Sequence, residues 1–204
     1  MIETICDIMK DAYTKGWITV RDGNASVRTA GQDYFFITPA NQRKNELQPA
    51  MFKKVNLAGE DLPHTLLSSN LPISGELPLH LGLQQKLPRG VDNRVVIHLH
   101  PTYILTAMRM GIDLSTIGEE FAELSNWTRV GPTIPDYVGV KNEALGEMVC
   151  ESLGLTGDGE IFQDVVGLKN HGVVAVDVTP RRAFEHIERL EHICQIIVLS
   201  ARYK

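Results

Sequence analysis

Apolar residues near the start of the chain recur at the spacing of an amphipathic helix. The pattern predicts a helix that ends at about Tyr13 and whose buried face comprises Ile2, Ile5, Ile8, Met9 and Ala12.

A second helical pattern closes the chain and begins at Thr179-Pro180, a pairing typical of a helix start. Its predicted buried stripe comprises Ala183, Ile187, Leu190, Cys194, Ile197 and Ala201. His186 and His192 fall outside this stripe among Glu and Arg residues, so we expect both on the surface.

Between these helices, strands alternate with shorter helical segments. Apolar and β-branched runs predict strands over Trp17–Val20, Tyr34–Thr38, Lys53–Leu57, Arg94–Leu99, Val165–Leu168 and Val173–Val176. Helices are predicted over about 76–86, 101–110 and 141–152, the first capped by Ser74. The last two strands form a predicted hairpin with His171 at its tip. The pattern indicates an α/β (α+β) domain with helices packed on a sheet.

Composition is that of a globular protein. The 204 residues suit one domain, 1–204, and the formal net charge of -5 without a long basic run argues against nucleic acid as a partner. No signal-peptide pattern and no membrane-length apolar run occur, so we expect a cytoplasmic location and no membrane partner. The three cysteines lack a Cys-x-x-Cys spacing, which indicates a reducing compartment and no thiolate zinc site.

Histidines provide the first candidate chemistry. His98 and His100 are two apart in a predicted strand, so their side chains point to the same face and can converge on one ion. The alternative is a hydrogen-bonded pair at a strand end. His171 offers a third imidazole, and three nitrogen ligands with an open fourth position are typical of catalytic zinc.

An acidic residue opens the predicted helix at Ser74-Gly75-Glu76, and His80 follows one turn later. Near a metal, the Glu76 carboxylate can act as a fourth ligand or as a general base. Alternatively, it only complements the positive end of the helix dipole. For His80, burial beside the site and a direct role both remain open. Polar turns are predicted at Asp22–Ser26 and Ile37–Asn41, where backbone N–H groups can face an anion.

These segments, in their order along the chain, resemble the class II aldolase/adducin family. The matching pieces span nearly the whole chain: Gly23–Arg28, Ile37–Pro39, Ser74–Glu76 with His80, Val96–Pro101, Ile134–Tyr137 and Asn170–Gly172.

The resemblance implies a three-layer αβα fold around a mainly antiparallel sheet, and a homotetramer with active sites near subunit contacts. It implies one Zn²⁺ per subunit on His98, His100 and His171, with Glu76 as the catalytic acidic residue and a displaceable metal ligand. The substrate or its phosphate would meet the turns at Asn24, Thr38, Ser74 and Gly75.

The sequence also departs from the family pattern. The aldolase turn Thr-Pro-Ser/Thr-Gly is here Thr38-Pro39-Ala40-Asn41, and the usual Ser-Ser before the acid is Ser74-Gly75. Two hydroxyl donors are therefore missing, which makes a non-phosphorylated polyol or hydroxy-keto acid a credible alternative to a phosphate. The tyrosine that protonates the departing aldehyde in fuculose phosphate aldolase has no clear match, and Phe121 lies in that region.

The reaction that the resemblance favours is zinc-dependent retro-aldol cleavage of a small ketose phosphate or related hydroxy-keto sugar through an enediolate. A sugar-phosphate 4-epimerase or a dehydratase on the same site is the first alternative. A non-catalytic, adducin-like interaction domain is the second, and the retention of all three histidines disfavours it.

Overall fold

The computed structural model describes residues 1–86, 92–135 and 142–201. Asp136, Tyr137 and Lys141, which figure in the expectations above, lie outside these ranges. The α-helices and strands follow in the order α1 (Ile2–Thr14), β1 (Asn24–Arg28), β2 (Tyr34–Ile37), β3 (Lys53–Asn56), β4 (Asp61–Leu62), α2 (Leu66–Ser69), α3 (Leu77–Gln85), β5 (Arg94–Leu99), α4 (Thr102–Arg109), α5 (Ile117–Glu120), α6 (Ala122–Trp127), α7 (Glu143–Ser152), β6 (Val165–Leu168), β7 (Gly172–Asp177) and α8 (Pro180–Ser200). Short 3₁₀ turns are η1 (Lys44–Glu46), η2 (Pro49–Met51) and η3 (Leu114–Thr116).

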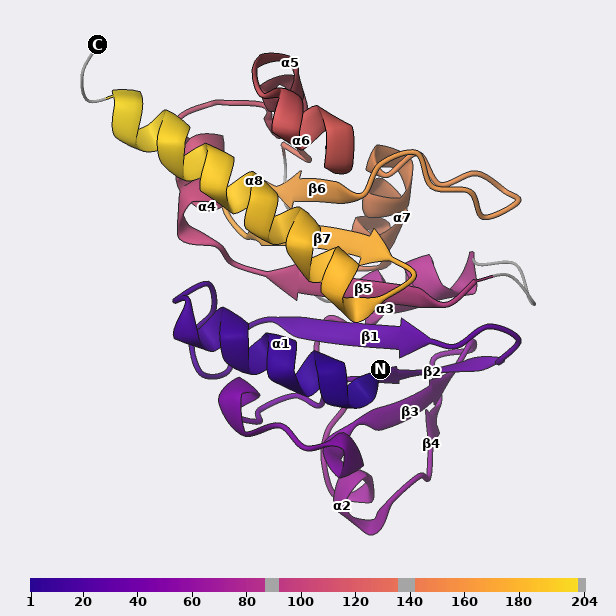
Figure 1. Ribbon diagram of the computed structural model, residues 1–204. Coiled ribbons are helices and arrows are strands. Elements are labelled where there is room, and N and C mark those ends of the chain that lie inside the picture. Colours follow the sequence, from indigo (N-terminus) through magenta and orange to yellow (C-terminus); the bar gives the residue numbers. More distant parts are fainter. Residues whose placement is uncertain (87–91, 136–141, 202–204) are drawn as a thin grey trace.

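A seven-stranded sheet in the order β4-β3-β2-β1-β5-β7-β6 forms the middle layer. The pairings between these strands are antiparallel. Helices α1 and α8 cross the front of the sheet in Figure 1, and α3 and α7 lie behind it. The expected three-layer αβα arrangement around an antiparallel sheet is confirmed.

The central strand β5 is buried along its whole length because both faces of the sheet are covered. Val95, Ile97 and Leu99 pack in the cluster with α1, α4 and α8, whereas Val96 packs in the cluster with α3 and α7. Since side chains alternate along a strand, His98 lies on the face of Val96, toward α3. The register places Asn24 of β1 opposite His98.

The expected strand over Trp17–Val20 is wrong. This segment is a loop after α1, and the strand begins later, at Asn24, within the segment expected to be a turn. Trp17 and Ile18 are buried against the core, which explains their apolar character without a strand. Gly23 allows the change of direction at a φ of 72°, and a Cβ there would lie 2.8 Å from Ile18 Cγ2.

The closing helix begins as expected. The Thr179 hydroxyl accepts a hydrogen bond from Arg182 N, and Pro180 occupies the first turn. The stripe is buried as far as Cys194, but Ala201 is exposed. Figure 1 shows why: the C-terminal end of α8 extends past the edge of the sheet.

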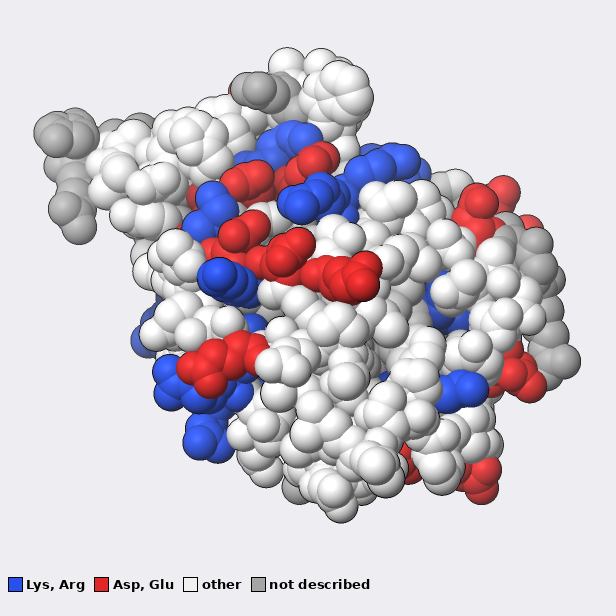
Figure 2. Space-filling view, turned by 60° about the horizontal axis from the view of Figure 1, so that its bottom comes forward, with Lys and Arg blue, Asp and Glu red and all other residues white. Residues whose placement is uncertain are grey.

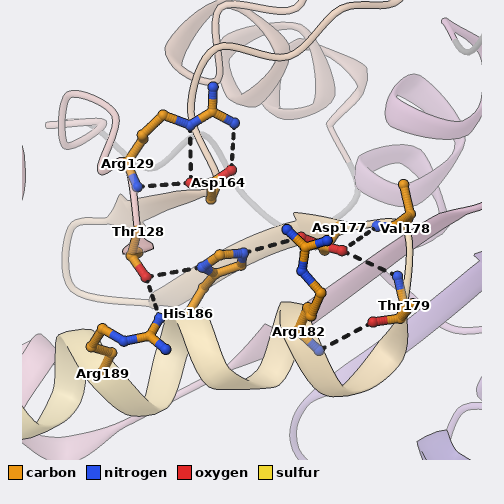
Figure 3. Close-up of polar contacts among 9 residues, drawn as sticks. All are labelled: Thr128, Arg129, Asp164, Asp177, Val178, Thr179, Arg182, His186 and Arg189. Atoms are coloured by element: carbon orange, nitrogen blue, oxygen red, sulfur yellow. Dashed lines mark hydrogen bonds and ion pairs between the residues drawn. The ribbon is translucent and has the colours of Figure 1, made fainter. Parts of the chain in front are cut away.

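The surface position expected for His186 is also wrong, whereas His192 is exposed as expected. His186 is only 5% exposed. Its Nε2 lies 3.2 Å from Asp177 Oδ2, and its Nδ1 lies 2.9 Å from Thr128 Oγ1 (Figure 3). The imidazole thus links α8 to the end of β7 and to the residue after α6, so its polar neighbours in sequence did not indicate its surroundings in space.

The surface carries both signs of charge. Figure 2 shows Lys and Arg side chains beside Asp and Glu on the face it displays, without a single continuous basic field.

Among the described residues, no helix combines the length and the apolar character that crossing a membrane would require.

Candidate metal centre

Three imidazoles meet at one end of the central strands. One ring nitrogen from each of His98, His100 and His171 lies within 4.8 Å of the others. His98 Nε2 is 2.9 Å from His100 Nε2 and 3.3 Å from His171 Nε2. The structure therefore brings together the three histidines that the sequence singled out.

Local structure explains this convergence. His98 is the penultimate residue of β5 and lies on the α3 face. His100, just after the strand, keeps that direction, and its backbone N–H donates to Trp17 O. Across the sheet, the turn between β6 and β7 is closed by a hydrogen bond from His171 N to Leu168 O. Asn170 takes a φ of 61° in this turn, a conformation that asparagine tolerates better than most residues.

Glu76 adds a carboxylate to the same point. Its Oε2 lies 3.3 Å from His98 Nε2, and its Oε1 lies 3.2 Å from His171 Nε2. A tetrahedral zinc with ligands at about 2.0–2.1 Å has ligand–ligand edges of about 3.3–3.4 Å. The separations among His98, His171 and Glu76, 3.2–3.3 Å, are close to these edges, whereas the 2.9 Å between His98 and His100 is shorter, so these two rings would move slightly apart around an ion.

Proton positions support the same conclusion. His98 Nδ1 lies 3.1 Å from the carbonyl oxygen of Val173, to which it donates. In a neutral ring this leaves a lone pair on Nε2, directed at the other two rings and at the carboxylate. Nitrogen lone pairs and a carboxylate oxygen that converge on one point are the ligand atoms that a cation site requires.

Burial keeps these groups in the states that metal binding needs. Desolvation lowers the pKa of His98 to about 3, against a smaller opposite effect from Glu76, and it also lowers the pKa of His100. Burial alone would raise the pKa of Glu76. The adjacent His98 imidazole and hydrogen bonds from His171 and Asn24 more than offset this and hold that pKa well below its usual range.

The four residues that were predicted to bind the substrate or its phosphate differ in their contacts and exposure. Asn24 Nδ2 donates to Glu76 Oε2 at 2.8 Å, and Ser74 Oγ accepts from Glu76 N at 3.3 Å. Ser74 is therefore not the helix cap that was expected, because Glu76 itself occupies that position. Thr38 is buried, and its hydroxyl accepts from Ala25 N. Gly75 is exposed, with open space where a side chain would be.

His80 is fully buried between α3 and β1, and it contacts Asn24 and Ser26. Sequence reasoning left its role open and missed Ser26 and Gln84, which are hydrogen-bonded to each other beside it. Their spacing was the available signal: Glu76, His80 and Gln84 are four apart on a helix, and Asn24 and Ser26 are two apart on a strand.

A separate hollow of about 310 Å³ lies at the opposite ends of β5 and β7, lined in part by Arg129, Asp164, Asp177 and Arg182. Its arginines are engaged: Arg129 pairs with Asp164 at 2.6 Å and Arg182 with Asp177 at 3.4 Å (Figure 3). We therefore place the chemistry at the histidine cluster.

Gly172 offers a direct test of how tightly this cluster is built. A Cβ at this position would lie 2.5 Å from Leu99 O and 2.7 Å from both His98 Cε1 and His100 Cδ2. We expect Gly172→Ala to displace these two rings and to weaken metal affinity at least about fivefold, since overpacking typically costs about 1–3 kcal/mol. Titration against a chromophoric chelator measures this. Gly157→Ala serves as the control, because Gly157 has no neighbour within 4 Å and, like Gly172, no positive φ. Equal metal affinity in both variants would contradict the prediction.

Comparisons with known proteins place this geometry in context. Residues 3–198 match the sequence profile of a family described as "Class II Aldolase and Adducin N-terminal domain". Comparison with curated protein sequences returned no significant match.

Solved structures share the fold. YgbL from Klebsiella pneumoniae, for which aldolase, epimerase and decarboxylase activities are proposed, is 23% identical, with a TM-score of 0.78 over 100% of this chain and 90% of that one. L-fuculose-1-phosphate aldolase from Thermus thermophilus is 22% identical, with a TM-score of 0.72 over 99% and 95%. A sugar-phosphate aldolase from Thermotoga maritima is 19% identical, with a TM-score of 0.76 over 99% and 95%.

Proposed function

The chain belongs to the class II aldolase/adducin family, and we propose that it is a metal-dependent lyase that cleaves a small ketose or related hydroxy-keto compound by a retro-aldol reaction. The observation that carries this proposal is the convergence of three imidazoles and one carboxylate on a single point. Three nitrogen ligands with an open fourth position are typical of catalytic zinc, so the cluster favours an enzyme over an interaction domain.

The proposed cofactor is Zn²⁺, one per subunit, held by His98, His100 and His171. Three imidazole nitrogens in a compact arrangement suit this ion, and His98 is already oriented by its hydrogen bond to Val173. When bound, the metal supplies a Lewis acid that stabilises negative charge on substrate oxygen atoms. Glu76 would be a displaceable fourth ligand, and its hydrogen bond to Asn24 would keep the carboxylate beside the site once substrate replaces it.

Glu76 is the proposed proton-transfer group. In retro-aldol cleavage the substrate hydroxyl gives its proton to water, the carbon–carbon bond breaks, and its electron pair stays on the carbon beside the carbonyl. That carbon then gains a proton from Glu76, which has itself taken a proton from water. In the reverse, aldol direction the Glu76 carboxylate removes the same proton as a base. Its low pKa keeps the resting carboxylate ionised, which is the form that can act as a base.

The polar end of the substrate is proposed to meet the segments at Asn24, Thr38, Ser74 and Gly75. Ser74 supports this because it adjoins Glu76. Ala40 and Gly75 lack the hydroxyl groups found in the aldolase pattern. Phosphate affinity should therefore be lower than in an enzyme with both groups, and unphosphorylated hydroxy-keto compounds belong in any substrate search.

A product screen of the zinc-loaded protein tests the reaction class. We expect an aldehyde and a shorter ketone from at least one ketose phosphate or hydroxy-keto acid, detected by mass spectrometry. Metal-stripped protein is the control. Conversion to an isomer of equal mass would replace lyase by epimerase, and loss of water alone would replace it by dehydratase. No conversion of any compound would count against an enzyme.

We also propose a homotetramer, following the family resemblance. Exposed apolar side chains such as Leu66 (90% exposed) and Trp127 (69% exposed) are compatible with subunit contacts. One chain has a mass of 22.7 kDa, and light scattering at micromolar concentration should give about four times this value. A fully active monomer would contradict this expectation.

A further inference from the structure

Buried polar side chains form a continuous row behind Glu76, between helix α3 and strand β1. The helix contributes Glu76, His80 and Gln84, and the strand contributes Asn24 and Ser26. Four helical residues rise about 6 Å and two strand residues about 6.6 Å. Because these repeats nearly match, side chains from the two elements can alternate along the whole contact.

The row is connected by hydrogen bonds at every step. Asn24 Nδ2 lies 2.8 Å from Glu76 Oε2, and Asn24 Oδ1 lies 2.5 Å from His80 Nε2. His80 Nδ1 lies 2.7 Å from Ser26 Oγ, which lies 2.9 Å from Gln84 Nε2. His80, Ser26 and Gln84 are completely buried, so these bonds do not compete with solvent.

Only one arrangement of protons satisfies both ends of the row. An ionised Glu76 can only accept, so the Asn24 amide must present its NH₂ group there and its oxygen to His80. His80 therefore donates from Nε2. Burial lowers the pKa of His80 to about 4, so its ring is neutral and Nδ1 accepts from the Ser26 hydroxyl. At the far end, Gln84 Nε2 also faces the carbonyl oxygen of Arg94, at 3.4 Å, which sets the orientation of that amide.

All the hydrogen bonds in the row therefore point toward the Glu76 carboxylate. Hydrogen bonds in such chains polarise one another, and those to a charged acceptor are stronger than neutral ones. The row thus fixes one carboxylate oxygen and leaves the other, Oε1, toward His171. An apolar contact between α3 and β1 would fill the same space without burying unpaired polar groups, but it would not orient a carboxylate.

We propose that Asn24 and His80 are positioning residues for Glu76: Asn24 holds the carboxylate, and His80 locks the Asn24 amide in the donating orientation. This inference rests on the proposed function, because it requires Glu76 to transfer the proton. It assigns Asn24 a task distinct from binding the polar end of the substrate, and the two tasks predict different kinetics.

The test compares steady-state kinetics of four variants on the substrate found in the product screen. Asn24→Ala and His80→Leu should each lower kcat about tenfold to a hundredfold, the loss typical of a hydrogen bond to a charged group, with KM little changed. His80→Gln, whose amide can still donate to Asn24, should recover most of the loss. His186→Leu removes another buried, hydrogen-bonded histidine at the far end of the sheet and should keep kcat.

Zinc affinity supplies a readout separate from turnover. It should stay within about threefold of the wild type in the Asn24 and His80 variants, because the three histidine ligands are intact and a shift of that size is under about 1 kcal/mol. A higher KM with unchanged kcat in Asn24→Ala would overturn the positioning role and favour substrate binding. Wild-type kcat in His80→Leu would overturn it as well. If His80→Leu does not fold, the kinetics of Asn24→Ala and His80→Gln still test the positioning role.

A measurement without substrate separates this inference from the proposed function. Nitrogen-15 NMR of the metal-free protein should show His80 as a neutral ring protonated at Nε2. Protonation at Nδ1 would reverse the row and overturn the inference, whatever the enzyme does. A wild-type protein without lyase activity but with the Nε2 tautomer would instead overturn the proposed function, and the catalytic meaning of the row with it.

Discussion

We expect Glu76→Gln to lower turnover at least about 10²-fold and to leave the binding of zinc unchanged. A proton on carbon beside a carbonyl is too weakly acidic for a carboxylate alone. A Lewis acid on the oxygen changes this, and general base catalysis then typically contributes about 10²–10⁴-fold. Glutamine preserves the shape of the side chain but cannot accept the proton. The three histidines remain, so metal content should be unchanged.

Two measurements follow this variant. Turnover is measured on the identified substrate, and exchange of its carbon-bound proton with deuterated water is followed by NMR. Both should fall together. Ser69→Ala, a change at an exposed serine of α2, controls for handling of the variants. If Glu76→Gln holds zinc and exchanges the proton at the wild-type rate, the base is another residue.

We expect replacement of both His98 and His100 with Ala to abolish metal binding and activity. Both residues present Nε2 to the same point, and loss of two of three nitrogen ligands leaves no chelating set. Lewis-acid stabilisation is worth several kcal/mol, so turnover should fall roughly 10³-fold or more. Elemental analysis after gel filtration measures the metal, and the product assay measures activity.

The thermal midpoint provides a second readout for this double variant. A ligand that binds only the folded state raises the midpoint, so zinc should stabilise the wild type but not the double variant. His192→Ala, an exposed histidine outside the cluster, should behave as the wild type. Full metal occupancy in the double variant would show that the ion lies elsewhere.

Much of the fold and the metal cluster follows from local patterns. The period-two spacing of His98 and His100 fixes a shared face, and the hairpin around His171 follows from two β-branched runs around a turn. The family resemblance then supplied the layer order, which periodicity alone leaves open.

Other features depend on contacts that a local pattern does not contain. Trp17–Val20 has the apolar character of a strand because it packs against the core as a loop, and four residues are too few to separate the two. His186 is buried because Asp177 and Thr128 approach it from other elements. The row from Glu76 to Gln84 required knowing that α3 lies along β1.

Anomalous X-ray diffraction at the zinc edge, on crystals of the protein loaded with one equivalent of Zn²⁺, tests the central claim most directly. The account predicts one strong peak per chain, about 2.0–2.1 Å from Nε2 of His98, His100 and His171. A strong peak elsewhere, with none among these three imidazoles, would contradict it.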